Sequence, residues 1–271
     1  MKKYLLNWLI LLTMTIGGTL LQAEEPLPDN FQIRLGGYIV GSQNTDFKVS
    51  QNGVGAIINL QDIFKLETTV NVFRMDGYYR FTPKHSIEFS LYSIKSKGQT
   101  DQDFQWADKN ITANGGLSTF FNTDIYKVNY VYSFYHNEEV ELGISGGLHI
   151  MKLAAGFNGS YNVDGNLSDA AAEDVIVTAP LPVVGFRVGY NILPSLSVKY
   201  SVDYFLVTYQ DINGGLVDSM LTLDWRMARN FGMGVGYNST RMRLVKDLGG
   251  GREASVNHDV AGAMVYATLT F

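Results

Sequence analysis

The feature that most constrains this chain is the unbroken alternation of its last thirteen residues, Asp259–Phe271. From Ala261 onward every odd-numbered residue is apolar, while the even-numbered side mixes glycine, threonine, methionine and tyrosine. A period of two is typical of a strand whose two faces meet different surroundings. An apolar strand with an unpaired edge aggregates in water, and a barrel that pairs its last strand with its first has no such edge. The segment therefore predicts the closing strand of an all-β, closed barrel.

The composition narrows the kind of membrane protein that such a barrel implies. The chain has 271 residues, of which only 17% are charged, and no cysteine. Its mean hydropathy of −0.01 excludes a bundle of membrane helices. The value fits a membrane barrel, because every second strand residue faces inward and dilutes the apolar ones. With a net charge of −5 and no phosphate-binding motif, we expect neither a nucleic-acid partner nor a cofactor.

The N-terminal segment has the pattern of a secretory signal. Lys2 and Lys3 precede an apolar core, Tyr4–Ile16, and the small residue Ala23 ends a cleavage site. The core is too short for a membrane-spanning helix, so we expect removal of residues 1–23. Residues 24–30 then form a short periplasmic leader, and residues 31–271 form a single barrel domain.

Ten segments have the alternation and length of tilted membrane strands, which need about 9–11 residues. They are Phe31–Val40, Val70–Phe81, Ser86–Lys97, Ser118–Tyr135, Val140–Leu153, Leu181–Ile192, Leu196–Tyr209, Val217–Ala228, Phe231–Leu244 and Asp259–Phe271. Short turns alternate with longer loops between them, as in outer-membrane barrels, where the short turns are periplasmic. The pattern predicts an antiparallel up-and-down barrel of ten strands, with eight or twelve as alternatives.

One face of each predicted strand is apolar, and the other face carries the charges of the predicted lumen. The residues expected to line the lumen are Arg34, Arg74, Asp76, Arg80, Glu88, Lys127, Glu141, His149, Arg187, Lys199, Asp203, Asp218, Asp224 and Arg226. Buried charges need partners, so these side chains pair either in a network that fills the barrel or around a narrow water-filled passage. A ten-stranded barrel lies close to the size that side chains can fill, which favours the first alternative.

A second group of charged residues lies near the predicted outer ends of the strands. Its members are Lys95, Lys97, Lys152, Arg241 and Arg243. Lysine and arginine bind phosphate well, and the outer leaflet carries lipid phosphates there. The group predicts contact with lipopolysaccharide, with ordinary interfacial charge as the alternative.

The runs Val72–Phe81 and Tyr132–Tyr135 resemble small outer-membrane β-barrel proteins of Gram-negative bacteria, a group that includes the OmpA-type and OmpW-type barrels. The aromatic residue at the end, Phe271, resembles the signal that such proteins present to the outer-membrane assembly machinery. The resemblance implies an outer-membrane location and contact with outer-membrane lipid. The group includes anchors, narrow pores and adhesins. We expect a monomer that acts as a structural or porin-like narrow channel for small ions or solutes.

Three alternative functions remain open. Loops Gly41–Thr69 and Asn158–Ala179 could serve adhesion, and the basic residues could serve lipopolysaccharide contact. A hydrolase at the outer rim, with His258 and Asp259, is a third alternative, because ten-stranded outer-membrane proteases use Asp and His there; Asp211 is its nearest further acid. On β geometry Ser145 and His149 lie about 13 Å apart along one face, too far for a hydrogen bond. We therefore expect no catalytic residue and no metal site.

Overall fold

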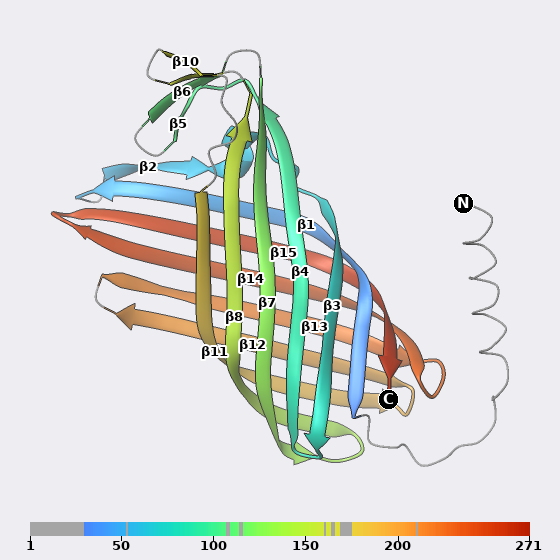
Figure 1. Ribbon diagram of the computed structural model, residues 1–271. Coiled ribbons are helices and arrows are strands. Elements are labelled where there is room, and N and C mark those ends of the chain that lie inside the picture. Colours follow the sequence, from blue (N-terminus) through green and yellow to red (C-terminus); the bar gives the residue numbers. More distant parts are fainter. Residues whose placement is uncertain are drawn as a thin grey trace, which may run out of the picture.

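The computed structural model describes residues 30–271, apart from residues 53, 107–108, 114–115, 160, 164–165, 169–174 and 210. Within these residues, ten long antiparallel strands form a closed barrel (Figure 1). They are β1 (Phe31–Gln51), β3 (Val70–Thr82), β4 (His85–Thr100), β7 (Leu117–His136), β8 (Val140–Asn158), β11 (Val175–Leu193), β12 (Leu196–Tyr209), β13 (Ile212–Arg226), β14 (Phe231–Gly249) and β15 (Arg252–Thr270). The predicted all-β barrel of ten strands is confirmed. Residues 1–29 lie outside the described part, so the signal peptide stays a prediction.

The first and last strands close the barrel. Backbone hydrogen bonds join Phe31 to Phe271 in both directions, at 2.9 and 2.8 Å. The antiparallel register continues without interruption from the Gln32–Thr270 pair to Val40–Gly262. The predicted role of the Asp259–Phe271 segment as the closing strand is therefore confirmed.

At the short turns the strands end within about two residues of the prediction, and β3, β7 and β12 also match it at the other end, whereas the remaining strands run three or more residues further there. Strand β1 has 21 residues and reaches Gln51, whereas alternation alone ended it at Val40. The reason is a β-bulge between Val40 and Ser42, which shifts the inward face from even to odd positions. The segment Gly41–Thr69 is therefore not a simple loop, because it holds the end of β1, strand β2 (Val54–Asn59) and helix α2 (Leu60–Phe64).

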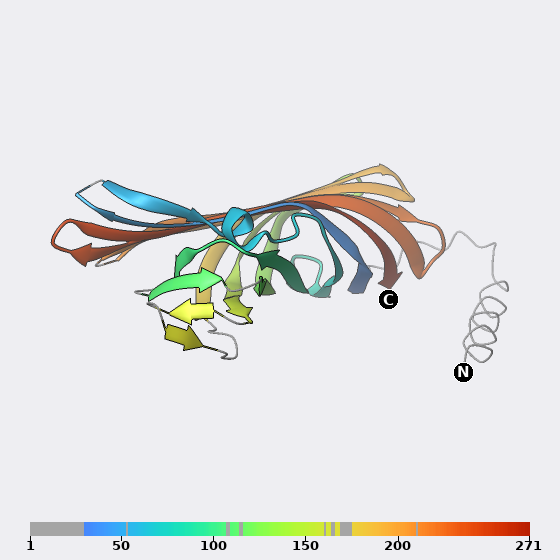
Figure 2. The ribbon, with the colours of Figure 1, turned by 90° about the horizontal axis from the view of Figure 1, so that it is seen from above.

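A small second sheet stands at the same end of the barrel. It consists of β5 (Phe104–Trp106), β6 (Lys109–Ala113), β9 (Tyr161–Val163) and β10 (Asn166–Ser168), in the order β10-β9-β6-β5. These strands come from the β4–β7 and β8–β11 connections. Figure 2 shows them as green and yellow arrows gathered on one side of the barrel.

The barrel wall divides into two sheets towards this end. Strand β11 pairs with β12 only up to Val184–Tyr204, and β1 pairs with β3 only up to Val40–Val70. Pro182 explains the first limit, because proline has no N–H to donate to a further partner strand. In Figure 1, β4, β7 and β8 continue towards the top of the view, whereas β1 and β15 continue towards the left.

Helix α2 fills the opening that this division leaves between β1 and β4. Leu60 and Phe64 of the helix, and Leu66 just after it, have buried side chains. The Asn59 side chain caps the helix by accepting a hydrogen bond from the Asp62 N–H at 3.0 Å. The backbone approaches β4 so closely that a Cβ atom on Gly98 would lie 2.2 Å from the Phe64 carbonyl oxygen. Glycine at this position therefore permits the helix to close the wall.

The outer face carries a continuous apolar belt from the short turns to about the middle of the strands. Val235 and Val265 are 49% and 52% exposed there. Aromatic side chains gather near the short turns: Phe81, Phe134, Tyr190, Trp225, Phe231 and Phe271 are all exposed. His85, at the start of β4, joins this belt, with its Nδ1 2.5 Å from the Tyr130 hydroxyl. The belt has the design of an outer-membrane barrel, whose short turns are periplasmic and whose long loops are extracellular.

No helix within the described residues is long and apolar enough to cross a membrane.

Candidate functional site

The centre of the membrane-embedded interior is a network around Lys127. The Lys127 Nζ lies 2.9 Å from Asp203 Oδ2 and also contacts Asp218 Oδ2. Arg187 extends the network, with its Nη2 2.8 Å from Asp203 Oδ1 and its Nε 2.8 Å from Glu88 Oε2. These side chains come from β4, β7, β11, β12 and β13, so the network ties opposite parts of the wall together.

Arg74 forms the next part of the interior and is linked to the first. Its guanidinium donates to both Asp76 carboxylate oxygens at 2.9–3.0 Å and to Asn238 Oδ1 at 2.8 Å. The Asn238 amide donates to Asp218 at 2.9 Å, which connects Arg74 to the Lys127 network. The Arg74 guanidinium also lies 4.4 Å from the ring centroid of Tyr92, a cation–π geometry. Each of the three guanidinium nitrogens of Arg74 therefore donates to at least one acceptor.

The remaining predicted lumen residues lie towards the periplasmic end. Arg34 Nη2 lies 3.2 Å from Asp224 Oδ2, and Tyr266 donates to the other Asp224 oxygen at 2.9 Å. Arg80 Nη2 pairs with Glu141 at 2.8 Å. Two further inward positions are half-buried: Lys199, whose Nζ lies 5.6 Å from the ring centroid of Tyr78, and Arg226.

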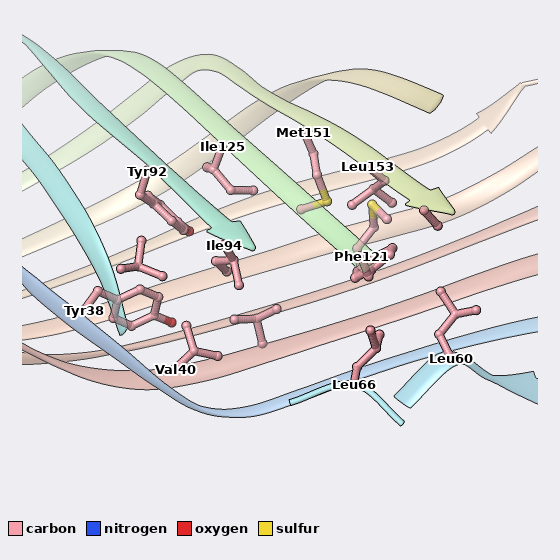
Figure 3. Packing of buried hydrophobic residues seen from close by; sticks show 14 of the residues in the cluster. Tyr38, Val40, Leu60, Leu66, Tyr92, Ile94, Phe121, Ile125, Met151 and Leu153 are labelled. Atoms are coloured by element: carbon pink, nitrogen blue, oxygen red, sulfur yellow. The ribbon is translucent and has the colours of Figure 1, made fainter. Parts of the chain in front are cut away.

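Beyond the charged network, towards the extracellular end, the interior is apolar (Figure 3). One sheet supplies Tyr92, Ile94, Phe121, Ile125, Met151 and Leu153, and the other supplies Val40, Leu216, Met242 and Val260. Leu60, Phe64 and Leu66 of the α2 segment cover this cluster at the extracellular end. In the described residues, the charged layer and the apolar layer therefore follow one another along the barrel interior.

Parity along single strands predicted which residues share a face but missed this apolar layer. A signal for it was present in the sequence. On β7, apolar residues lie outside and charged ones inside around Lys127, but this order is reversed around Phe121, where Asn122 and Asp124 face outward. The reversal marks the place where the outer surroundings change from lipid to water.

Neither His149 nor His258 is paired with the residue considered as its catalytic partner. His149 is fully buried beside Lys127, and neither of its ring nitrogens has a hydrogen-bond partner in the described part of the chain. Ser145 donates towards Asp203 at 3.5 Å instead of towards His149. His258 is buried against Phe121 and bonds to the Thr45 hydroxyl at 2.9 Å.

His258 and Asp259, considered together for a hydrolase at the outer rim, do not lie on the same side of the wall. Successive strand residues face opposite sides of the wall, so His258 lies inside while Asp259 is exposed outside. Asp211 lies beside Lys246, at 3.8 Å, and not beside either of them. Among the described residues no group of three or more His, Cys, Asp or Glu could hold a metal ion.

The five basic residues predicted to meet lipid phosphate all sit at outward positions but fall into two separate groups. Lys95, Lys97 and Lys152 lie on β4 and β8, in one sheet. Arg241 and Arg243 lie on β14, in the other sheet, just beyond the apolar belt. Neither arginine forms an ion pair with a residue of the described part of the chain.

Arg241 and Arg243 border a groove on the outer wall that the sequence did not predict. Its volume is about 390 Å³, and it crosses β12, β13, β14, β15 and β1. Leu206, Gly215, Val217, Asn257, Asp259 and Asp46 also line it. These residues are far apart in sequence, so only the strand register brings them together. The pairs Arg241–Asp259 and Arg243–Asn257 are directly opposite each other on β14 and β15.

Comparisons with known proteins assign no family to the chain. No family model matches it, and no curated protein matches it significantly. Three solved structures are similar over most of its length. Ail of Yersinia pestis has 12% identity and a TM-score of 0.30, covering 88% of this chain and 97% of its own. OprG of Pseudomonas aeruginosa has 12% identity and a TM-score of 0.35, covering 89% and 95%.

The third structure is the toluene transporter TodX of P. putida, with 9% identity and a TM-score of 0.33, covering 90% of this chain and 91% of its own. At these scores the similarities carry no argument about function. The closed barrel and its outward apolar belt identify the chain as a β-barrel of the bacterial outer-membrane type.

Proposed function

We propose that this protein is a closed outer-membrane barrel that works as an anchor for its own extracellular half and does not conduct. The observation that supports the proposal is the presence of two successive layers of buried side chains in the interior. In the charged layer, Lys127, Asp203 and Asp218 are buried and paired with one another. In the apolar layer, the α2 segment covers the extracellular side.

The size of the barrel supports the same reading. A barrel of about eight strands is just wide enough for side chains to fill, whereas sixteen or more strands leave an aqueous channel. A narrow passage lined by the charged residues, from Arg34 to Arg226, is the alternative. An ion could use that passage only by separating paired charges such as Arg187 and Asp203, which lie 2.8 Å apart. The separation would leave uncompensated charges in a desolvated interior, which is strongly unfavourable.

Planar-bilayer recording of the purified protein tests this proposal. We expect no conductance steps from the native protein. The Phe64→Ala/Leu66→Ala variant, which weakens the cover but leaves the charged layer intact, should also stay closed. A steady current through the native protein that changes with Arg74→Met or Arg187→Met would establish the channel and reject the closed barrel.

The extent of the strands beyond the belt supports a role in display outside the cell. Strand β14 has 19 residues, about twice the 9–11 that a membrane span needs. The small sheet of β5, β6, β9 and β10 adds to this extracellular part, which includes the described residues of both segments expected to serve adhesion; residues 53, 160, 164–165 and 169–174 of those segments lie outside the described part. Because the chain has no cysteine, single cysteines can report on exposure. A membrane-impermeant maleimide should label Gly250→Cys in whole cells but not Asn230→Cys, and the reverse pattern would refute the orientation.

Contact with lipopolysaccharide is a second candidate function, favoured by the groove beside Arg241 and Arg243. The five basic side chains stand at outward positions above the apolar belt, at the level of the lipid headgroups. Co-purification of lipopolysaccharide with the native protein, and its loss when all five are replaced by glutamine, would support this candidate. Unchanged co-purification would reject it.

A further inference from the structure

We propose that the outer-wall groove is a built site for the phosphorylated sugar headgroup of an outer-leaflet glycolipid. The inference rests on the second candidate function above and makes it specific. It assigns binding to one of the two basic groups, Arg241 and Arg243, and leaves Lys95, Lys97 and Lys152 as general interfacial charge.

The two arginines supply a phosphate clamp. They are two residues apart on β14, so both face outward, about 6.5–7 Å from each other along the strand. Both are exposed, and neither is held by an ion pair in the described part of the chain. Two guanidinium groups at this spacing can bind one phosphate between them with charge-assisted hydrogen bonds.

Acceptor groups stand opposite the arginines on β15 and β1. Asn257 faces Arg243 in the register, and its Oδ1 is buried without a hydrogen-bond partner in the described residues. Asp259 faces Arg241 and is exposed. Asp46 lines the same side and is held in place by the Asn59 and Asn44 amides, at 2.7 and 3.1 Å.

These acceptors indicate the chemical class of the ligand. A buried amide oxygen without a donor is unfavourable, so the ligand must supply hydroxyl or amide N–H groups beside its phosphate. A phosphorylated amino sugar carries both kinds of group on one ring. A bare phosphate can offer the Asn257 Oδ1 only its own P–OH group, without the hydroxyl and amide groups of a sugar, and it is repelled by the nearby carboxylates of Asp46 and Asp259.

The rest of the groove suits the apolar part of such a lipid. Leu206 is 83% exposed at one side, and Val217 lies on the neighbouring strand. Gly215 gives the groove its depth, because a Cβ atom there would lie 2.9 Å from the Leu206 side chain. Along β13 and β14 towards the periplasmic end, the Ser219–Ser239 pair follows the groove, and the exposed apolar pair Leu221–Tyr237 comes next, so acyl chains could continue along this face into the membrane. Its volume of about 390 Å³ is within the usual range of ligand sites.

The test measures binding of the full-length protein in detergent to four probes by titration calorimetry: diphosphoryl lipid A, dephosphorylated lipid A, phosphatidylglycerol and inorganic phosphate. We expect lipid A to bind at least about tenfold more tightly than each of the other three, since only it offers phosphate and sugar together. Arg241→Gln/Arg243→Gln should weaken lipid A binding by about tenfold or more. The charge-matched variant Lys95→Gln/Lys97→Gln should stay within about threefold of the native protein.

Two further variants separate the parts of the site. Gly215→Leu fills the groove without changing charge and should also weaken lipid A binding. Asn257→Leu should weaken lipid A binding but leave phosphatidylglycerol binding unchanged. All variants face the outside of the wall, and their unfolding midpoints in urea show whether the barrel is intact.

Several outcomes would overturn the inference. Equal binding of lipid A and phosphatidylglycerol would mean that the groove does not recognise the sugar of the headgroup. Equal losses in the arginine and lysine variants would mean that only general charge is sensed, while lipopolysaccharide contact itself would survive. Absence of lipid A binding to the native protein would reject both the site and that contact, but would leave the closed barrel untouched.

Discussion

The two halves of the barrel wall have opposite polarity. On β14, the membrane half places Met233 and Val235 outside and Asn238 inside, whereas the extracellular half places Arg241 outside and Met242 inside. The residue types change sides within a few positions of one unbroken strand. Each face takes the polarity of its surroundings, so the apolar face is outside where the wall meets lipid and inside where it meets water.

The difference explains why the interior is built in two ways. A wall surrounded by lipid must keep its outer face apolar, so its inner face can hold charges that satisfy each other, as around Lys127. A wall surrounded by water gains stability from an apolar interior, as in a soluble sandwich of two sheets. The division of the barrel into two sheets beyond Val184 and Val40 fits this second design, because two packed sheets need no closed hydrogen-bonding ring.

The largest expected effect comes from the charged half. Replacing Lys127 by methionine leaves Asp203 and Asp218 facing each other without their shared cation. Breaking a buried charge pair costs about 3–5 kcal/mol. We expect the free energy of unfolding, measured with urea in detergent micelles or lipid vesicles, to fall by this amount. The triple variant Lys127→Met/Asp203→Asn/Asp218→Asn should regain much of the loss, and a loss below about 1 kcal/mol in the single variant would contradict the buried network.

A slightly smaller effect is expected in the apolar half. Phe121→Ala removes a buried ring from the layer between the sheets, which costs about 3 kcal/mol, the lower end of the range for such changes, because α2 can settle into the space. The loss should not depend on salt, because no charge is removed. Limited proteolysis should cut the extracellular strands of Phe121→Ala faster and spare the periplasmic turns. Equal protection of both ends would show that the two halves unfold as one unit.

Alternation predicted the ten strands and the shared inner face, because a period of two is a local property. It could not predict the strand ends, since the bulge after Val40 shifts the phase, or α2, since five residues are too few for a helical period. Arg241 and Arg243 were predicted from their positive charge alone. The groove beside them was not predictable, because Asn257 and Leu206 join it only through the register of four strands.

The outer face offers a paired test of where lipid ends and water begins. Val235 and Ser239 both face outward on β14, four residues apart. Arginine at Val235 would lie within the apolar belt and should cost about 2–4 kcal/mol, whereas arginine at Ser239 would lie at the boundary and should cost about 0–1 kcal/mol. Urea unfolding in lipid vesicles measures both. Similar losses at the two positions would place the boundary elsewhere on the strand.

The smallest expected effect concerns the α2 segment, which covers the apolar layer of the extracellular half. Asn59 caps α2 and also donates to Asp46 and Asn44, at 2.7 and 2.5 Å, so its replacement by alanine removes the helix cap and two links to β1. Loss of a cap costs about 0.5–2 kcal/mol. We expect this loss to appear as local opening, with faster hydrogen exchange in residues 60–66 and an unchanged urea midpoint for the barrel. Asn59→Asp keeps the cap acceptor but removes the amide donor, so it should restore the helix more fully than the links to β1. If Asn59→Ala lowers the urea midpoint of the whole barrel as well, the cover and the charged layer are coupled, and the two halves do not behave as separate units.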